Sequence, residues 1–285
     1  MNTNDKKILV TGAGGQLGSE LRCVLGDRAE YVGRDTLDLT DTKTVHDYLR
    51  AHDFRYVVNA AAYTAVDRAE EEKSECAAAN VTIVENLAAL ADELDFRIIH
   101  ISTDYVFDGH TSRPYTEVDK PEPLSVYGTT KRRGETSLLG LAPDSMIIRT
   151  GWLYSSFGSN FVKTMLRLAK SGGPLRIVAD QVGTPTYAAD LAAFIVDKVI
   201  DGHWNPGIYN FSNEGVASWY DFAVAVVEEA GMDVEVLPIA TVDYPTAATR
   251  PAFTILDKTK VRAAYGIDIP HWRKSLRRCM KLITN

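Results

Sequence analysis

The chain has 285 residues, of which 45% are hydrophobic and 24% are charged, and its formal net charge is −7. This balance is typical of a folded globular protein and excludes disordered, collagen-like and coiled-coil chains. The acidic charge argues against a nucleic-acid-binding protein, and no apolar run approaches the roughly 18 residues of a membrane span.

The cysteines and histidines predict neither a disulfide framework nor a metal site. Cys23, Cys76 and Cys279 are an odd number, lie far apart and form no Cys-x-x-Cys pair. Scattered cysteines of this kind are typical of reduced thiols. The six histidines form no ligand pair at helical or hairpin spacing. The start, Met1–Lys7, does not resemble a signal peptide. We therefore expect a cytoplasmic protein without a bound metal.

The first half alternates short apolar runs with amphipathic stretches. The runs predict strands buried on both faces of a parallel sheet: Ile8–Thr11, Tyr31–Gly33, Tyr56–Ala60, Arg97–Ile101 and Met146–Thr150. The stretches predict connecting helices: Gln16–Leu25, one around Val45, Tyr48 and Leu49 with Thr40 or Asp41 as N-cap, one long helix Ser74–Leu94, and Tyr127–Leu138. Strands joined by helical crossovers predict an α/β fold with a doubly wound parallel sheet of the Rossmann type.

The second half is less regular and richer in proline. Its predicted strands are Leu175–Val178, Ile208–Phe211 and Val234–Leu237, and its predicted helices are Phe161–Ala169, Leu191–Ile200, Ser218–Ala230 with Ser218 as N-cap, Asp257–Ala264 and Trp272–Ile283. We interpret it as a smaller α/β cap. Residues 1–150 are then a dinucleotide-binding domain, and residues 151–285 are mainly a substrate-binding domain with segments that return to the sheet. Two sets of apolar residues are interpreted as packing residues of the cap: Phe161, Met165 and Leu168 on one helix face, and Trp204, Trp219 and Trp272.

A glycine loop follows the first strand. Gly12, Gly15 and Gly18 are spaced as Gly-x-x-Gly-x-x-Gly between a predicted strand and a predicted helix. In a dinucleotide-binding loop the first glycine permits a tight turn, the second lets the backbone approach a pyrophosphate, and the third lets the helix pack against the sheet. The helix N-terminus offers free N–H groups to phosphate. The sequence therefore predicts a dinucleotide site, with Gly12, Gly15 and Gly18 among its residues.

Residues for the adenosine end follow the second strand. An acidic side chain here bonds a ribose hydroxyl, whereas an arginine accepts a 2′-phosphate. The sequence has both, Arg34 and Asp35, so we expect NADPH, with NADH as the alternative. Asp38 and Leu39 come next, where an adenine edge could lie. After the third strand, the small side chains of Ala60–Ala62 would let a loop pass close to the cofactor.

A tyrosine and a lysine share one face of the helix predicted after the fourth strand. Tyr127 and Lys131 are one turn apart. A nearby ammonium stabilises a phenolate, so Lys131 is expected to lower the pKa of Tyr127 toward working pH. The fourth strand ends in Ser102 and Thr103, and a hydroxyl at the carboxyl end of a central strand faces the cofactor crevice. There Thr103 could bond a substrate carbonyl as negative charge develops.

Together these motifs resemble the extended short-chain dehydrogenase/reductase superfamily. Within it, the chain resembles the dTDP-4-dehydrorhamnose reductase family along nearly its whole length. The runs that carry this resemblance are Asn59–Asp67, Ser102–Gly109, Arg149–Tyr154, Asn160–Ala169, Asp180–Thr186 and Arg250–Pro251.

The resemblance implies an oxidoreductase that reduces C4 of dTDP-4-dehydro-L-rhamnose with NADPH or NADH, in the synthesis of dTDP-L-rhamnose for cell-surface polysaccharide. It implies that Tyr127 donates the proton, Lys131 tunes Tyr127 and holds the nicotinamide ribose, and Thr103 orients the carbonyl. Family positions give as cofactor contacts Gly15, Gln16, Leu17, Asp35, Asp38, Leu39, Ala62, Tyr63 and Thr64, to which we add Ser102. They give as sugar-nucleotide contacts Thr103, Asp104 and Trp152.

Some assignments on the substrate side remain open. Trp152 either stacks on the deoxysugar or packs between sheet and cap, and Arg250 is our own candidate for the substrate pyrophosphate. Gly151 stands where the family often has serine, which weakens any hydrogen-bond argument there. Some members of the family use carboxylates to form a metal-bridged dimer. Neither the residues after Thr186 nor the C-terminus carry a matching acidic cluster, so we expect a monomer or a homodimer. Alternatives are another nucleotide-sugar reductase, an epimerase, or a non-catalytic regulatory subunit.

Overall fold

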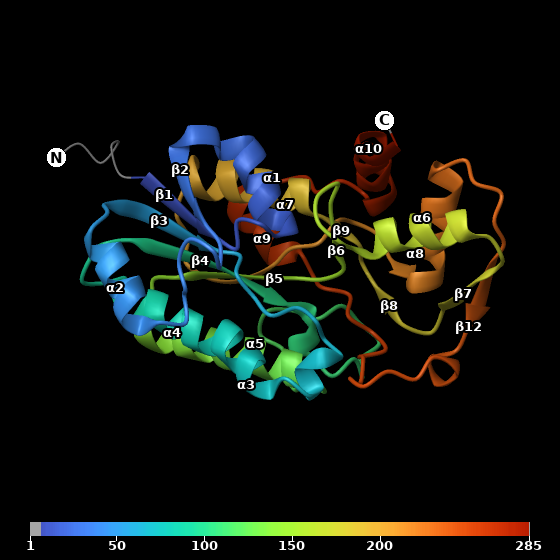
Figure 1. Cartoon of the computed structure of the whole chain (residues 1–285), viewed down its shortest axis with the longest axis horizontal. Helices are drawn as coiled ribbons and strands as arrows, with labels where there is room; N and C mark the ends of the chain where they lie inside the picture. Colours follow the sequence, from blue (N-terminus) through green and yellow to red (C-terminus); the bar gives the residue numbers. More distant parts are fainter. Residues whose placement is uncertain (1–6, 285) are drawn as a thin grey trace.

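The centre of the molecule is a six-stranded sheet in which every neighbouring pair is parallel. The computed structural model describes residues 7–284 (Figure 1). Most of the segment Met1–Lys7, which we expect not to be a signal peptide, therefore lies outside the described residues. The strand order is β10-β5-β4-β3-β1-β2. Its members are β1 (Lys7–Thr11), β2 (Ala29–Val32), β3 (Phe54–Asn59), β4 (Arg97–Thr103), β5 (Met146–Thr150) and β10 (Gly207–Asn210). The doubly wound α/β prediction is confirmed.

Helices cover both faces of this sheet (Figure 1). One face carries α2 (Thr42–Arg50), α3 (Lys73–Ala77), α4 (Ile83–Ala88) and α5 (Val126–Leu141); the other carries α1 (Gln16–Leu25), α7 (Ala188–Ala193), the π-helical turn Phe194–Ile200 and α9 (Thr259–Tyr265). Successive strand residues face opposite cores: Val10 and Val58 lie in one, Leu9 and Val57 in the other. Two-sided burial explains why these strands are continuously apolar rather than alternating.

The long helix predicted over 74–94 is interrupted and shorter. A π-helical turn, Ala78–Thr82, separates α3 from α4, and regular helix ends at Ala88. Asn80, in that turn, bonds the backbone of Tyr63 through its side chain, and its carbonyl packs against Gly134 of α5. The apolar pattern continues to Leu94 because turns also bury their residues, so periodicity alone could not place the end. Of the two predicted N-caps for α2, Asp41 is the one found, and the predicted N-cap Ser218 of α8 (Trp219–Glu229) is confirmed.

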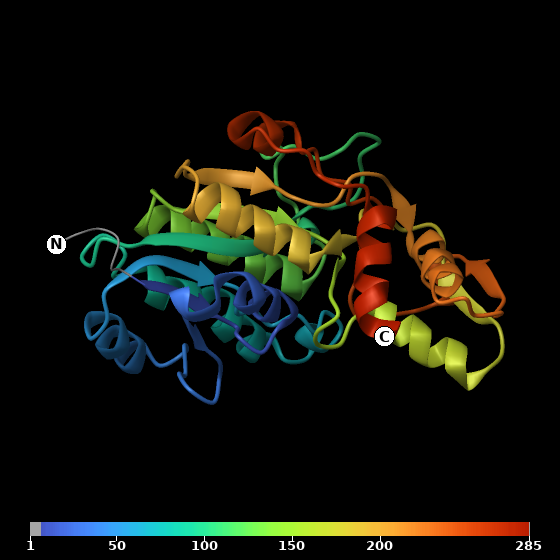
Figure 2. The ribbon, with the colours of Figure 1, turned by 90° about the horizontal axis from the view of Figure 1, so that it is seen from above.

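The cap is built from three helices and small sheets. It contains α6 (Phe161–Ser171), α8 (Trp219–Glu229), α10 (Trp272–Thr284) and the two-stranded pairs β6 (Leu153–Tyr154) with β9 (Thr186–Tyr187), β7 (Leu175–Val178) with β12 (Val236–Ile239), and β8 (Val182–Gly183) with β11 (Ala217–Ser218). Figure 2 shows the arrows of the large sheet pointing toward this cap. The cap therefore lies beyond the carboxyl ends of the parallel strands. The described residues also contain the 3₁₀ turns Gly26–Arg28, Arg68–Glu70, Asp104–Val106 and Thr241–Asp243.

The apolar residues expected to pack in the cap do so with one exception. Met165 and Trp272 are buried in the cap core, with Phe161, Leu168 and Trp219 against it. Trp204 was placed wrongly: its ring lies 5.7 Å from the ring of Tyr56, and its Nε1 donates to Asp144. The chain has already returned to the large sheet at this point, because β10 begins three residues later and pairs with β5.

Candidate active site

The strand order reverses between β1 and β3, and ligands of open α/β sheets bind at such a point. The two strands end side by side, and the Thr11 hydroxyl donates to Asn59 Oδ1 over 2.7 Å. Gly12 follows with φ +68°, and a Cβ there would lie 2.6 Å from the carbonyl oxygen of Ala60. Only glycine fits this close approach of two loops.

The glycine loop leaves the start of α1 open to an anion. Gly15 is the N-cap of α1 and has no side chain, so no N-cap side chain accepts a hydrogen bond from the first N–H groups of the helix. Leu17 is buried beneath the loop, whereas the side chain of Gln16 reaches the cap through Leu153 and Asn160. This geometry fits a dinucleotide pyrophosphate.

Gly18 and Gly14 provide a matched pair of substitutions in this loop. A Cβ on Gly18 would fall 2.9 Å from Ala13 Cα and closer still to the Gly12 carbonyl, whereas a Cβ on Gly14 would meet nothing within 4 Å. Gly18→Ala is therefore expected to weaken NADPH binding at least tenfold, since about 1.4 kcal/mol of strain already gives that factor. Gly14→Ala is expected to change it by less than threefold. Fluorescence titration measures both, and equal affinities would contradict the packing argument.

Arg34 and Asp35 lie together in the exposed turn after β2. Leu37 and Leu39 are buried, and the carboxylate of Asp38 is bonded by Thr40, which lowers the pKa of Asp38. Because the side chains of Arg34 and Asp35 are exposed, both can contact the adenosine end of a cofactor.

The loop after β3 is anchored from beneath. The N–H of Ala61 donates to Thr11 Oγ1 and Asn59 Oδ1 over 3.3 and 3.2 Å. The N–H of Tyr63 donates to Asn80, and its phenol bonds Glu72. Ala60, Ala62 and Thr64 are at least partly exposed along the loop. Because its polar groups are held, the loop is preorganised to pass close to a ligand.

Tyr127 lies in the first turn of α5, where Ser125 caps the helix. A Cβ on Gly128 would fall 2.9 Å from Pro123 and closer to the carbonyl of Tyr105, so this turn packs tightly on the segment after β4. Burial raises the pKa of the Tyr127 phenol, and the nearby Thr103 hydroxyl opposes that rise. The predicted Tyr127–Thr103 pair is thus brought together as a neutral proton donor beside a hydroxyl.

Lys131 differs from the expectation. Its Nζ donates to the carbonyl of Ile101 over 2.6 Å and lies 3.3 Å from His100 Nε2. Burial lowers the pKa of Lys131 to about 8, and Glu135 opposes that shift. Lys131 is not among the groups that shift the pKa of Tyr127, and its amino group is bonded to β4 instead. The expected lowering of the Tyr127 pKa is therefore not found in this structure.

The hydroxyl of Ser102 points away from the site. It donates to Glu135 Oε1 over 2.6 Å, and Glu135 also receives two bonds from Arg149, all of them buried. Strand alternation explains the difference, since Thr103 then faces the opposite side. Only the backbone of Ser102 remains for a cofactor contact.

Asp104 is buried directly behind Thr103, whose hydroxyl donates to Asp104 Oδ1 over 3.0 Å. Burial raises the pKa of Asp104 to about 6, while the nearby hydroxyls of Thr254 and Thr103 oppose that rise. A Cβ on Gly151 would fall 2.5 Å from Asp104 Cγ. The glycine therefore makes room for this carboxyl, and its departure from serine has a packing reason.

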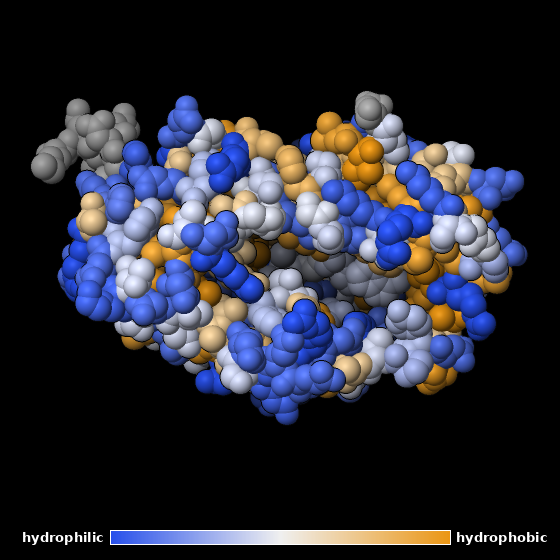
Figure 3. Space-filling model, in the orientation of Figure 1, coloured by the Kyte–Doolittle hydropathy of each residue, from blue (hydrophilic) through white to orange (hydrophobic). Residues whose placement is uncertain are grey.

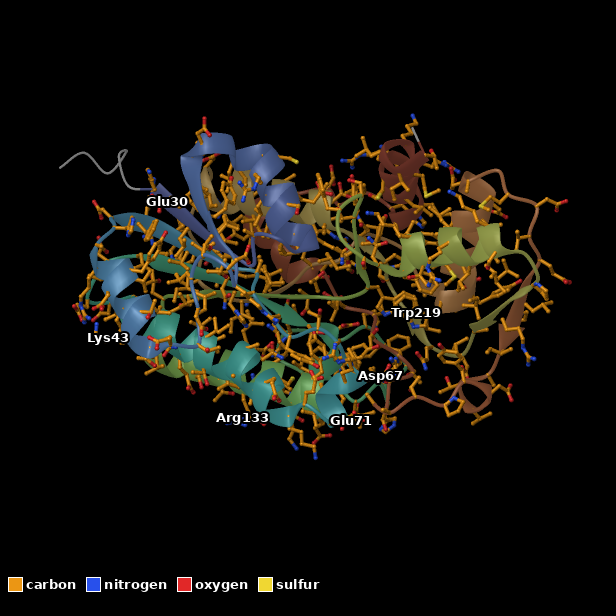
Figure 4. All side chains as sticks on the ribbon, viewed as in Figure 1. Glu30, Lys43, Asp67, Glu71, Arg133 and Trp219 are labelled. Carbon is orange, nitrogen blue, oxygen red and sulfur yellow. The ribbon has the colours of Figure 1, made fainter. Side chains whose placement is uncertain are left out.

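Two residues predicted for the substrate side already have partners. Trp152, with φ +50°, stacks on Trp219 with ring centroids 3.5 Å apart and planes 4° apart. Arg250 pairs with Asp67 through two bonds, the shorter 2.6 Å. Figure 3 shows a hollow between the sheet and the cap. Figure 4 labels Asp67 and Trp219, the partners of Arg250 and Trp152.

Within residues 7–284, no three His, Cys, Asp or Glu side chains form a metal-binding group. No helix in that range is long and apolar enough to span a membrane.

Sequence reasoning missed the polar residues beneath the site. His100 interrupts an otherwise apolar strand, and Asn59 ends another. Both are fully buried and bonded to each other. A polar side chain inside a buried strand must find a partner, and that was the signal available.

Comparison with known proteins gives a consistent result. The family model described as "RmlD substrate binding domain" matches residues 6–285. The chain is 45% identical to the dTDP-4-dehydrorhamnose reductase of Aggregatibacter actinomycetemcomitans, over 95% of this chain and 97% of that protein. A dTDP-4-dehydrorhamnose reductase structure from Clostridium acetobutylicum aligns with TM-score 0.94 and 39% identity, covering 98% and 100% of the chains. One from Bacillus anthracis in complex with NADP aligns with TM-score 0.93 and 35% identity, covering 97% and 99%.

Proposed function

The chain belongs to the RmlD substrate-binding family, and we propose that it is an oxidoreductase that reduces the C4 ketone of dTDP-4-dehydro-L-rhamnose to dTDP-L-rhamnose. The reductases of this family described above support this function and the use of NADPH. The observation that carries it is the placement of the Tyr127 phenol near the Thr103 hydroxyl at the carboxyl end of β4. That pair lies on the same sheet edge as the open N-terminus of α1.

NADPH supplies the hydride when bound. As the C4 carbonyl gains negative charge, Tyr127 gives its proton to the forming oxygen, so a ketone, a hydride and a proton become one alcohol. Thr103 holds the same oxygen by a hydrogen bond. Lys131 holds the nicotinamide ribose. Since burial keeps the phenol of Tyr127 protonated, the proton is available at neutral pH.

The remaining assignments follow from this proposal. Residues 1–150 bind the cofactor, and residues 151–285 mainly bind the nucleotide sugar, with β10 returning to the large sheet. Trp152 forms a wall of the sugar site, and Arg250 leaves Asp67 to meet the substrate pyrophosphate. The enzyme acts in the cytoplasm as a monomer or homodimer on a small molecule, without nucleic acid.

A substrate assay tests the function. Purified protein with dTDP-4-dehydro-L-rhamnose is expected to oxidise one NADPH for each dTDP-L-rhamnose formed, measured by absorbance and chromatography. Conversion to another sugar without net NADPH loss would indicate an epimerase. No conversion at all would favour a non-catalytic subunit.

Arg34 decides the cofactor preference. Its exposed guanidinium would make charge-assisted bonds to a 2′-phosphate, so Arg34→Gln is expected to raise the KM for NADPH about tenfold and leave that for NADH within twofold. Asp35→Asn is the matched control and should weaken NADH instead. Equal losses for both cofactors in Arg34→Gln would contradict the assignment.

A further inference from the structure

A continuous chain of buried polar side chains connects the glycine loop to Lys131. Thr11 donates to Asn59 over 2.7 Å, Asn59 Nδ2 lies 3.1 Å from His100 Nδ1, and His100 Nε2 lies 3.3 Å from Lys131 Nζ. None of the four side chains is more than 1% exposed. They come from β1, β3, β4 and α5 and cross three adjacent strands. The proposed reaction uses Lys131 alone among them.

The orientation of Asn59 fixes where His100 carries its proton. Asn59 Oδ1 accepts from both Thr11 Oγ1 and the N–H of Ala61, so its amide nitrogen faces His100 as a donor. His100 Nδ1 must then accept, which places the proton of the neutral ring on Nε2. That N–H points at Lys131, where only an uncharged amine has a lone pair to receive it.

A charged Lys131 requires the opposite arrangement. An ammonium must donate to Nε2, so the ring proton moves to Nδ1 and needs an acceptor on Asn59. A half-turn of the Asn59 amide provides it. The amide nitrogen then donates to Thr11 Oγ1, and the N–H of Ala61 retains Thr11 Oγ1 at 3.3 Å. Each contact among the four side chains again pairs a donor with an acceptor, whereas the Ala61 N–H loses Asn59 Oδ1 and faces the amide nitrogen, which disfavours this arrangement.

We propose that His100 and Asn59 are positioning residues for Lys131, and that the tautomer of His100 and the orientation of Asn59 change together with the charge of Lys131. The consequence for catalysis rests on the proposed function, through the role of Lys131. The coupling itself rests on the hydrogen-bonded chain alone.

The electrostatic surroundings fit this coupling. Burial, and then Lys131, hold the pKa of His100 well below its ordinary value, so the ring stays neutral and can only exchange tautomers. Burial lowers the pKa of Lys131 to about 8, within reach of neutral pH. The titratable groups that bear on Lys131 are Glu135 on its own helix and Cys76 on α3, with His100 in contact from β4. Because Thr11 and Ala61 adjoin the cofactor loops, the charge of Lys131 is coupled to those loops.

Nitrogen NMR of histidine-labelled full-length protein tests the tautomer change directly. His100→Gln assigns the signal. As pH rises through the midpoint of Lys131, the wild-type ring is expected to stay neutral and change from Nδ1–H to Nε2–H. Lys131→Met is expected to hold one tautomer at every pH. One tautomer throughout in the wild type, or an imidazole that becomes charged near its ordinary pKa of about 6.5, would overturn the proposal.

Thr11 tests the far end of the chain. When Lys131 is charged, Thr11 Oγ1 is the acceptor for both the Asn59 amide nitrogen and the Ala61 N–H. Thr11→Val removes that acceptor and therefore destabilises the charged-lysine arrangement in particular. The tautomer midpoint should therefore fall by on the order of one pH unit. Thr11→Ser retains the hydroxyl and is expected to retain the midpoint. An unchanged midpoint in Thr11→Val, or equal shifts in both variants, would overturn the coupling. These spectra need no substrate, so their failure would leave the reductase assay unaffected.

Discussion

Tyr127→Phe is expected to lower kcat by two to four orders of magnitude, while the Kd for NADPH changes by less than threefold. Removal of a positioned proton donor forfeits this much, because the developing oxyanion then depends on water or on Thr103 alone. The ring itself remains, so the packing of α5 on the segment after β4 is retained. Steady-state turnover and cofactor titration separate the two effects.

Tyr105 is the matched control for Tyr127. Its ring contacts that of Tyr127 edge to face at 6.0 Å, yet it stands outside the Tyr127–Lys131 helical face. Tyr105→Phe should leave kcat within a few-fold of wild type. Near-normal turnover in Tyr127→Phe, or equal losses in the two variants, would remove Tyr127 from the role of proton donor.

The parts of the fold that the sequence predicts well are those dictated by local rules. Leu9 and Val10 lie in a strand buried on both faces, and Gly12 lies in a tight turn; the continuous apolar run and the glycine spacing that predict them are both features of the local sequence. The N-caps at Asp41 and Ser218 follow the same logic, since each bonds a backbone N–H three residues away.

The structure brings several of the predicted site residues together, but with contacts that differ from those expected. Sequence spacing places Lys131 beside Tyr127, whereas the β4 carbonyl of Ile101 competes for its ammonium. Likewise Ser102 and Thr103 were both assigned to the site, but the alternation of side chains along β4 directs the Ser102 hydroxyl to Glu135 instead. The partner of Lys131 depends on long-range packing that no local pattern records, whereas strand alternation is a local signal that separates Ser102 from Thr103.

The second large effect is expected at Glu135, one turn after Lys131. Its carboxylate is fully buried and receives two bonds from Arg149 of β5, itself 1% exposed, plus one each from Ser102 and Arg132. Glu135→Leu leaves the Arg149 charge buried without its partner. We expect a loss of about 3–5 kcal/mol in the free energy of unfolding, from urea titration. Glu93→Gln, at an exposed pair with Arg50, should cost less than about 1 kcal/mol.

The double variant Glu135→Leu/Arg149→Met distinguishes the contribution of the two buried charges to stability from the contribution of the volume that the two side chains fill. An apolar pair of similar volume removes both buried charges, so most of the lost stability should return.

The pH dependence of the free energy of unfolding gives a second check. Burial raises the pKa of Glu135, but the bonds from its partners outweigh this and lower it. Its stabilisation is therefore complete above the unfolded pKa of about 4.3 and is lost as pH falls through the folded value. The double variant should lack that loss, and an undiminished acid-side decline would mean that other carboxylates control it.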